Sequence, residues 1–367
     1  MHISREFLET GMQRPRGLLV VTVAGLLVLS GCVGTGLLED PADADDEVDG
    51  ELEVHHIDVG QADSTLLVTP AGETILIDTG DWPADGQGVI DYLEAEGIDR
   101  IDHLVATHAH ADHIGGHAAV IEHFEERGDG VGAAYDSGVA HTSATYDNYL
   151  DAVEEYEIRL FEVVDGDTLG LEDEAVEATV LHPPEGDSGV DLHDNSVVLS
   201  VEFGAVSYLT TGDAEDGPEE RLVDERGDAL AADVYQAGHH GSSTSSSEPF
   251  LEAVDPDIAV ISSALESQYG HPHDEVLESF ADRGIETYWT GVHGDVVLMT
   301  DGQSVSVTTD REGPTDPSAL LERKQDAQSE SLSQDPLRAD SPPQPTAASS
   351  HSSPPGVQDV APRTTGR

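Results

Sequence analysis

The sequence predicts an α+β domain in which two β-sheets pack face to face between outer helices, a four-layer αββα sandwich. Three observations lead to this prediction. Short apolar strands alternate with helical segments across residues 52–311. A loop rich in histidine and aspartate follows the strand expected at 101–106, and a lone carboxylate, Asp213, ends a later hairpin. Loops at strand ends can turn several side chains toward one point, so we expect metal ions along one edge between the sheets.

The two ends of the chain differ from its middle. Residues 1–32 hold arginines followed by an apolar run, 18–31, which is too short for a comfortable membrane span and is typical of a signal peptide. The run ends in Leu29-Ser30-Gly31-Cys32, which resembles a lipobox, and Cys32 is the only cysteine in the chain. We therefore expect a membrane-anchored lipoprotein outside the cytoplasm. The alternative is an uncleaved anchor or a plain signal peptide.

Two further segments lack an apolar period. Residues 33–51 have the composition of an acidic tether, and residues 312–367, rich in Ser, Pro, Gln, Thr and Ala, are predicted to be a disordered tail. The folded domain is then expected at 52–311, a size at which one core is sufficient.

The charge of the chain is strongly negative. The 367 residues include 15 Lys and Arg against 75 Asp and Glu, a formal charge of −60, and Lys324 is the single lysine. Such a charge repels itself in dilute salt, but the Debye length falls to about 3 Å at 1 M salt. The composition therefore suggests a salt-loving organism. An acidic patch for a cationic partner fits poorly, because the acid is spread along the whole chain.

The expected strands share β-branched and apolar residues bounded by Gly, Asp or Pro. They lie at 52–59, 65–69, 74–80, 101–106, 158–164, 176–181, 197–203, 205–210, 233–237, 258–262, 287–289 and 296–299. The expected helices combine polar residues with apolar ones at helical spacing. They lie at 88–95, 118–124, 146–156, 219–225 and 275–281.

The loop after the strand at 101–106 carries four metal-capable side chains within six positions: His108, His110, Asp112 and His113. His108 and His110 could serve one metal ion, and Asp112 and His113 a second ion beside it. Imidazole and carboxylate ligands suit zinc, manganese or iron. The alternative is a histidine-rich surface loop that binds no metal.

The His-x-His-x-Asp-His spacing resembles the signature of the metallo-β-lactamase-fold hydrolases. The runs 58–64, Asp-Val-Gly-Gln-Ala-Asp-Ser, and 238–243, Gly-His-His-Gly-Ser-Ser, narrow the resemblance to the hydrolase domain of ComEC-family DNA-uptake proteins. It covers roughly residues 53–300, and the long membrane channel of that family is not matched.

The resemblance implies roles for further residues. Asp213 is expected to bridge the two metals, and His240 to complete the second, with His239 at the substrate or behind the ligands. Asp58 and Asp78 are expected to support, by hydrogen bonds, the loop that carries His108 to His113, which we call the metal loop. Ordinary turn capping is the alternative for both.

The third motif departs from many members of the fold, which have a histidine ligand there. This chain has Asn195-Ser196, as ComEC-like sequences do. Both residues are expected to bind substrate, but a structural role for Asn195 in the turn is an equal alternative, and His193 could be a displaced ligand. His271 could donate a proton or hold a phosphate, or it could simply begin a helix.

The resemblance thus implies a metal-dependent hydrolase, a phosphodiesterase or nuclease with Asp112, His239 and His271 as catalytic residues. Two divalent ions, zinc first and manganese second, would lower the pKa of a water between them toward about 7. The expected partners are a phosphodiester or nucleic-acid substrate and the membrane; no protein partner is predicted. The rivals are hydrolysis of a β-lactam or thioester, and a non-catalytic binding lipoprotein. The lack of a basic charge excess makes small phosphodiesters as credible as nucleic acid.

Overall fold

The computed structural model describes residues 48–186 and 189–334. The predicted signal peptide, Cys32, residues 33–47 of the tether and residues 335–367 of the tail lie outside the described residues. Among the helices that are described, none is both long and apolar enough to cross a membrane.

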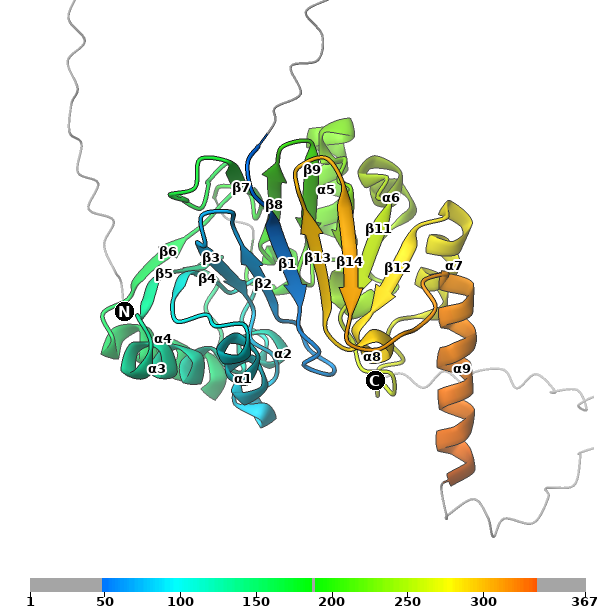
Figure 1. The fold of residues 1–367 in the computed structure, drawn as a ribbon, viewed down its shortest axis with the longest axis horizontal. Coiled ribbons are helices and arrows are strands. Elements are labelled where there is room, and N and C mark those ends of the chain that lie inside the picture. Colours follow the sequence, from blue (N-terminus) through cyan, green and yellow to red (C-terminus); the bar gives the residue numbers. More distant parts are fainter. Residues whose placement is uncertain (1–47, 187–188, 335–367) are drawn as a thin grey trace, which may run out of the picture. The chain divides into compact units, whose positions relative to one another are not determined.

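Two β-sheets form the centre of the domain (Figure 1). The eight-stranded sheet has the order β14-β13-β1-β2-β3-β4-β5-β6. Its strands are β1 (Leu52–His56), β2 (Thr65–Val68), β3 (Thr74–Ile77), β4 (Ile101–Val105), β5 (Val131–Asp136), β6 (Arg159–Glu162), β13 (Val296–Thr300) and β14 (Val305–Thr309). The six-stranded sheet has the order β12-β11-β10-β9-β8-β7. Its strands are β7 (Val176–His182), β8 (Val198–Phe203), β9 (Val206–Thr210), β10 (Val234–Gln236), β11 (Ile258–Ile261) and β12 (Glu286–Trp289).

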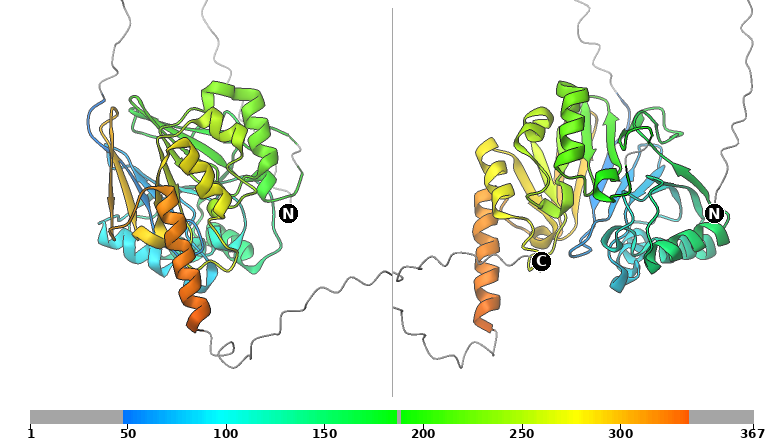
Figure 2. Two further views of the ribbon diagram at one scale, coloured as in Figure 1. Left: turned by 90° about the vertical axis from the view of Figure 1, so that its right-hand side faces the viewer. Right: turned by 180° about the vertical axis from the view of Figure 1, so that it is seen from behind.

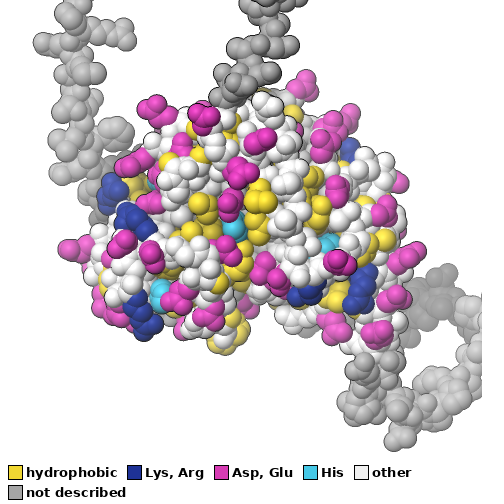
Figure 3. All heavy atoms as spheres, viewed as in Figure 1, with side chains coloured by type: hydrophobic (Ala, Val, Ile, Leu, Met, Phe, Trp, Pro, Cys, Tyr) yellow, Lys and Arg dark blue, Asp and Glu magenta, His cyan; other side chains and the backbone are white. Residues whose placement is uncertain are grey.

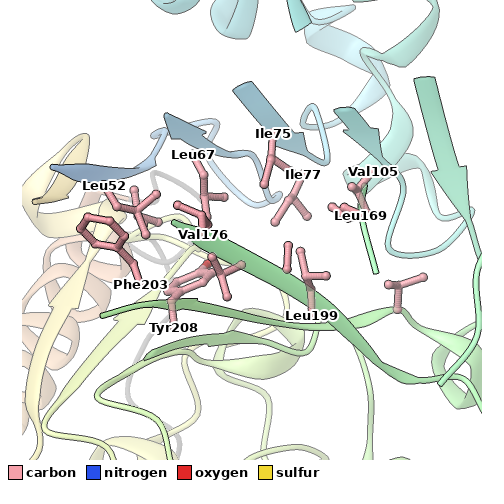
Figure 4. Close-up of a cluster of buried hydrophobic side chains, with 14 of the residues drawn as sticks. Leu52, Leu67, Ile75, Ile77, Val105, Leu169, Val176, Leu199, Phe203 and Tyr208 are labelled. Carbon is pink, nitrogen blue, oxygen red and sulfur yellow. The ribbon is translucent and has the colours of Figure 1, made fainter. Parts of the chain in front are cut away.

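Apolar side chains from both sheets fill the space between them (Figure 4). Strand β3 shows how the two-residue period divides its side chains: Ile75 and Ile77 belong to this inter-sheet core, and Leu76 belongs to the core on the outer side. From the six-stranded sheet, Leu199, Phe203 and Tyr208 enter the same inter-sheet core. The central strands are therefore buried on both faces, which explains their nearly continuous apolar sequences, whereas the edge strands β6 and β14 are largely exposed.

Helices cover the two outer faces (Figures 1 and 2). Those packed on the eight-stranded sheet are α1 (Gln87–Ala95), α3 (His117–Arg127) and α4 (Ala144–Glu155). Those packed on the six-stranded sheet are α5 (Asp216–Arg226), α6 (Glu248–Val254) and α7 (Asp274–Arg283), and α9 (Pro317–Gln334) packs against α7. Helices α2 (Ala111–Ile114) and α8 (Thr290–His293) are single turns. The predicted four-layer αββα arrangement is confirmed.

Apart from the single turns α2 and α8 and the short 3-10 helices, three elements within residues 52–311 were not predicted: β5, α6 and β14. Strand β5 reads Val-Gly-Ala-Ala-Tyr-Asp, and glycine and alanine carry little strand propensity by themselves. It forms because its backbone is paired on both sides, in parallel with β4 and β6. Tertiary pairing thus overrides local propensity here.

The prediction of a disordered tail from residue 312 is wrong for its first part, because Pro317–Gln334 form helix α9. Its buried positions, Pro317, Leu320, Lys324 and Ala327, recur at helical spacing, and Leu320 joins the core under α7. The ammonium group of Lys324 donates to the carbonyl of Pro272 over 2.6 Å and to Asp274 Oδ1 over 2.5 Å. The prediction failed because Leu320 and Lys324 are few among the polar residues of this segment, and its composition is otherwise that of a disordered tail.

We expect Leu320→Ala to lower the free energy of unfolding by about 2–5 kcal/mol, because it leaves a cavity under α7. The exposed Gln325 on the opposite face offers a control, since Gln325→Ala should change stability by less than about 0.5 kcal/mol. Denaturant unfolding followed by circular dichroism measures both. Equal stability of the two variants would show that α9 is not part of the cooperative unit.

Candidate metal centre

Site residues follow the carboxyl ends of neighbouring parallel strands. In the eight-stranded sheet, Asp78 follows β3 and Thr107 follows the parallel β4. In the six-stranded sheet, Asp213 follows β9 and His240 follows the parallel β10. Open α/β sheets commonly place ligands outside these strand ends, and here the two sheets offer such ends to one site.

A first group of ligand atoms comes from the metal loop, from the short 3-10 helix His193–Asn195 and from Asp213. His110 Nδ1 lies 2.9 Å from His108 Nε2 and 3.1 Å from His193 Nε2. Asp213 Oδ2 lies 3.7 Å from His108 Nε2. Ligands around one tetrahedral ion with bonds of about 2.0–2.1 Å lie roughly 3.3 Å apart, so this group fits a metal ion. His193 therefore lies where the missing third-motif histidine is needed.

A second group lies beside the first. His113 Nε2 is 3.1 Å from Asp213 Oδ1, and His240 Nε2 is 3.3 Å from Asp112 Oδ2 and 3.8 Å from Asp213 Oδ1. The two imidazole nitrogens and Asp213 Oδ1 are buried and have no hydrogen-bond partner among the described residues. Each such orphaned group costs about 1–3 kcal/mol, and a cation between them would satisfy all three. The carboxylate of Asp213 is thus shared between both groups.

Asp78 orients the histidines from behind, as predicted. His113 Nδ1 donates to Asp78 Oδ2 over 2.7 Å, which leaves Nε2 free for a metal. The hydroxyl of Thr107 donates to the same oxygen over 2.7 Å and lies 3.2 Å from His108 Nδ1. The backbone N–H of Thr107 donates to Asp78 Oδ1 over 2.9 Å. One carboxylate therefore fixes the start of the metal loop and the rings of His108 and His113.

The histidine pair after β10 is held in a left-handed backbone conformation, with φ of 50° at His239 and 56° at His240. Residues other than glycine enter this region at a cost of about 1–3 kcal/mol each, and such positions cluster at functional sites. The turn sends the two rings to different places. His240 Nδ1 donates to the carbonyl of Ser262 over 3.1 Å, which directs Nε2 into the second group, so His240 is the ligand candidate as expected.

His239 lies outside that group, against Glu215. Its Nδ1 is 3.2 Å from Glu215 Oε1, and its Nε2 is 3.5 Å from Asp213 Oδ2. Glu215 Oε1 is also 3.4 Å from His193 Nδ1, so this carboxylate sets the orientation of a ligand of the first group. Glu215 was not predicted, and its only signal in the sequence is its place two residues after Asp213.

The electrostatics of the centre favour bound cations. Burial opposes the ionisation of Asp213, but the imidazoles of His113 and His240 outweigh it and hold its pKa well below the ordinary value. Burial likewise opposes protonation of His240, yet the carboxylates of Asp213 and Asp63 raise its pKa to about 9. Protons on histidines thus balance the carboxylates when no ion is bound. Metal binding at His240 Nε2 would release its proton.

Asp63 is a site residue for which no role was predicted. It is buried, its Oδ1 accepts from Gln236 Nε2 over 3.1 Å, and its Oδ2 lies 3.6 Å from His240 Nδ1. Burial raises its pKa to about 6, despite the imidazoles of His240 and His113. Its position is set by its backbone N–H, which donates to the carbonyl of Asp112 over 3.1 Å.

The prediction that Asp58 supports the metal loop by hydrogen bonds is wrong. The carboxylate of Asp58 is 3.0 Å from Arg311, and its backbone N–H donates to Asp295 over 2.7 Å. These bonds tie the segment after β1 to Asp295, which directly precedes β13, and to Arg311, which follows β14. Within the Asp58–Ser64 run it is therefore Asp63 that approaches the ligands.

Asn195 and Ser196 do not face the pocket, contrary to the prediction of substrate binding, because both are fully buried. The amide of Asn195 donates to the carbonyl of Asp191 over 2.7 Å, which is the structural alternative. The hydroxyl of Ser196 accepts from the backbone N–H of Asp213 over 3.0 Å. Gly212 is required beside them, since it has φ +51° and a Cβ there would lie 2.4 Å from Ser196 Oγ. Both residues position the shared carboxylate.

A pocket of about 240 Å³ opens over the two groups. Its lining consists of His110, Asp112, His193, Asp213, His239, His240, Tyr269 and His271. His271 Nδ1 lies 3.3 Å from the amide nitrogen of Gln61. Burial and the neighbouring imidazoles of His240, His273 and His239 lower the pKa of His271 to about 4, so its ring is neutral at pH 7. The geometry thus places His239 and His271 on the pocket wall, where a catalytic role stays a prediction.

A four-layer αββα sandwich with histidines and aspartates gathered at one edge of its sheets defines the class of metallo-β-lactamase-fold proteins. Residues 57–264 match the metallo-beta-lactamase superfamily, and the chain belongs to this superfamily.

Individual relatives confirm the resemblance to the ComEC family. ComE operon protein 3 of Bacillus subtilis is 31% identical over 262 residues, which are 67% of this chain and 33% of that protein. Competence protein ComA of Neisseria gonorrhoeae is 33% identical over 238 residues, 65% of this chain and 30% of that protein. The chain thus spans about a third of the length of these relatives. Among solved structures, CmlA, a diiron β-hydroxylase from Streptomyces venezuelae, is similar with a TM-score of 0.46 and 18% identity, over 69% of this chain and 55% of that one.

We expect Asp213→Asn to lower metal affinity at least 10–100-fold, the range typical of partners that only support a ligand. The fold should persist, since Asp213 lies in a loop and not in an apolar core. Metal content after dialysis and far-ultraviolet circular dichroism measure the two effects. Asp151→Asn, a change at an exposed position of α4, is the matched control. Full metal content in Asp213→Asn would remove Asp213 from the shared position.

Proposed function

We propose that this protein is a metal-dependent phosphodiesterase that holds two divalent cations, zinc in the first place and manganese as the alternative. The observation that carries the proposal is the division of Asp213, whose Oδ2 faces the first group of histidines and whose Oδ1 faces the second. Asp213 would therefore help to hold both ions, and together the ions would supply positive charge to one phosphate group. Such pairs, about 3.5–4 Å apart, are used in phosphatases and nucleases.

The residues of the two groups would bind one metal ion each. His108, His110 and His193 would hold one ion, and Asp112, His113 and His240 the other, with Asp213 shared between them. The ions would supply Lewis-acid stabilisation of the phosphate oxygens and an activated water. Asp112 also faces the pocket, and His239 and His271 on the wall could hydrogen-bond the phosphate or the leaving oxygen.

A nucleic acid is one member of this substrate class, and the similarity to ComE operon protein 3 and competence protein ComA favours it. The negative charge of the chain opposes binding of a nucleic acid by electrostatic attraction alone. On the face shown in Figure 3, Asp and Glu side chains are scattered over the whole surface, and Lys and Arg are few. None of the described residues that line the metal pocket is Lys or Arg. The ions, with hydrogen bonds from His239 and His271, would therefore supply the contacts to phosphate.

The metal-replete protein in molar salt should hydrolyse bis(p-nitrophenyl) phosphate and oligonucleotides, and chelation should abolish both activities. A chromogenic β-lactam and an aryl thioester serve as the comparison substrates. Product release followed by absorbance and by gel measures all four. Turnover of the β-lactam or thioester without any phosphodiester turnover would overturn the proposal in favour of acyl hydrolysis on the same metals.

We further propose that the protein acts outside the cytoplasm, anchored to the membrane through lipid on Cys32, as its lipobox-like sequence suggests. Cys32→Ser should then prevent lipidation and shift the protein from the membrane fraction to the medium, or block its maturation. Fractionation with an antibody to the folded domain measures the shift. A Cys32→Ser protein that stays with the membranes unchanged would contradict the anchor.

A further inference from the structure

Beside the metal pocket lies a second hollow of about 400 Å³ that the hydrolytic chemistry leaves unused. It is lined by Trp82, Asp85, Ala111, Gly115, Ala118, Ala144, Thr145 and Asn148. Ala111 stands between His110 and Asp112, which both line the metal pocket, so residues of one short segment, 110–112, line both hollows. The chain has two tryptophans: Trp289 is fully buried, and Trp82 has 63% of its surface exposed.

A single exposed apolar side chain is ordinary on a protein surface. Trp82 differs because its loop is held against the helix that carries metal-ligand candidates. Two backbone hydrogen bonds join the β3–α1 loop, which carries Trp82, to the short helix α2 and the glycine that follows it. The N–H of Thr79 donates to the carbonyl of His113 over 2.7 Å, and the N–H of Gly115 donates to the carbonyl of Gly80 over 2.9 Å. A Cβ on Gly115 would lie 2.1 Å from the backbone nitrogen of Trp82. The glycine therefore lets the tryptophan segment pack against the helix that holds Asp112 and His113.

The chemistry of the hollow fits a flat, weakly polar group. The indole offers a stacking face, and the side chains of Thr145 and Asn148 offer hydrogen bonds at its rim. Asp85 is the one charged residue among those that line it, so the hollow does not attract an anion. A second exposed aromatic, Tyr269, lines the metal pocket itself from a loop of the other sheet.

We propose that Trp82 and this hollow form a stacking subsite for a nucleobase of a single-stranded nucleic acid whose neighbouring phosphodiester lies over the metal ligands. The inference rests on the proposed phosphodiesterase function and names its substrate class. Stacking on aromatic side chains tolerates any base and gains nothing from positive charge on the protein. A chain with a formal charge of −60 therefore retains this means of binding a polyanion, and molar salt does not screen it.

Tryptophan fluorescence tests the subsite without relying on turnover, because Trp289 is shielded and Trp82 is exposed. The full metal-loaded chain in molar salt is titrated with an octameric oligothymidylate whose phosphorothioate linkages resist hydrolysis. An abasic octamer with the same linkages is the matched ligand. We expect quenching by the oligothymidylate and none by the abasic strand. An oligouridylate of the same length shows whether RNA binds as DNA does.

Variants separate stacking from other contacts, with affinity measured by the anisotropy of a labelled strand. Trp82→Ala should weaken binding roughly 5- to 150-fold, the loss of one base–aromatic stack. Trp82→Phe should keep most of the affinity and lose the quenching. Phe161→Ala, which removes an exposed aromatic from the edge strand β6, should change neither. Circular dichroism confirms that each variant is folded.

Two results would overturn the subsite: equal binding by Trp82→Ala and the unchanged chain, or equal binding of the abasic and base-bearing strands. Either result leaves the proposed function standing if the protein still hydrolyses bis(p-nitrophenyl) phosphate. Conversely, base-dependent quenching in a protein that hydrolyses no phosphodiester would keep the stacking subsite and refute the phosphodiesterase. The failure of the two proposals is therefore distinguishable.

Discussion

The arrangement of the site depends on one buried carboxylate. Asp213 is almost inaccessible to solvent, and its two oxygens face two different groups of imidazoles. An isolated buried charge costs so much free energy that it must be paired or must bind a metal. The fold meets this requirement by bringing histidines from three separate segments to within 3.9 Å of Asp213. They are His108 and His113, His193, and His239 and His240. The hydrogen bonds behind the ligands, through Asp78 and Ser262, then decide which ring nitrogen points at the centre.

Parallel strands explain why such distant residues meet. Strands β3 and β4 end side by side, so Asp78 reaches Thr107, and β10 and β11 end side by side, so His240 reaches Ser262. The close approach of loops at these ends needs positions without a side chain. Gly212 lies against Ser196, and Gly115 lies against Trp82. The precision of the centre therefore comes from sheet register and backbone packing rather than from the ligand loops alone.

Most of the layered fold and four of the ligand candidates could be predicted from local patterns: strand periodicity, and four ligands within six positions. Two more, Asp213 and His240, were predicted from the resemblance to a known family. The residues that were missed, misplaced or left with two alternatives depend on tertiary contact. His193 is a ligand candidate only because a 3-10 turn brings it to His110, and Asn195 is excluded only by its burial. Asp58 and Asp63 are five residues apart, and the path of the chain after β1 decided which one reaches His240.

The C-terminal helix shows how the acidic composition constrains the fold. Salt screens the carboxylates on the surface and so reduces their mutual repulsion. Salt does not screen a buried contact between two helices to the same extent, so acceptor groups there need a positively charged side chain from the protein. Lys324, the single lysine, is buried at such a junction and bonds the carbonyl of Pro272 and the carboxylate of Asp274. Pro272 directly follows His271, a wall residue of the metal pocket. A chain with few cations thus places this one where it fastens α9 to the segment that shapes the pocket, which connects the stability of the C-terminal helix to the geometry of the site.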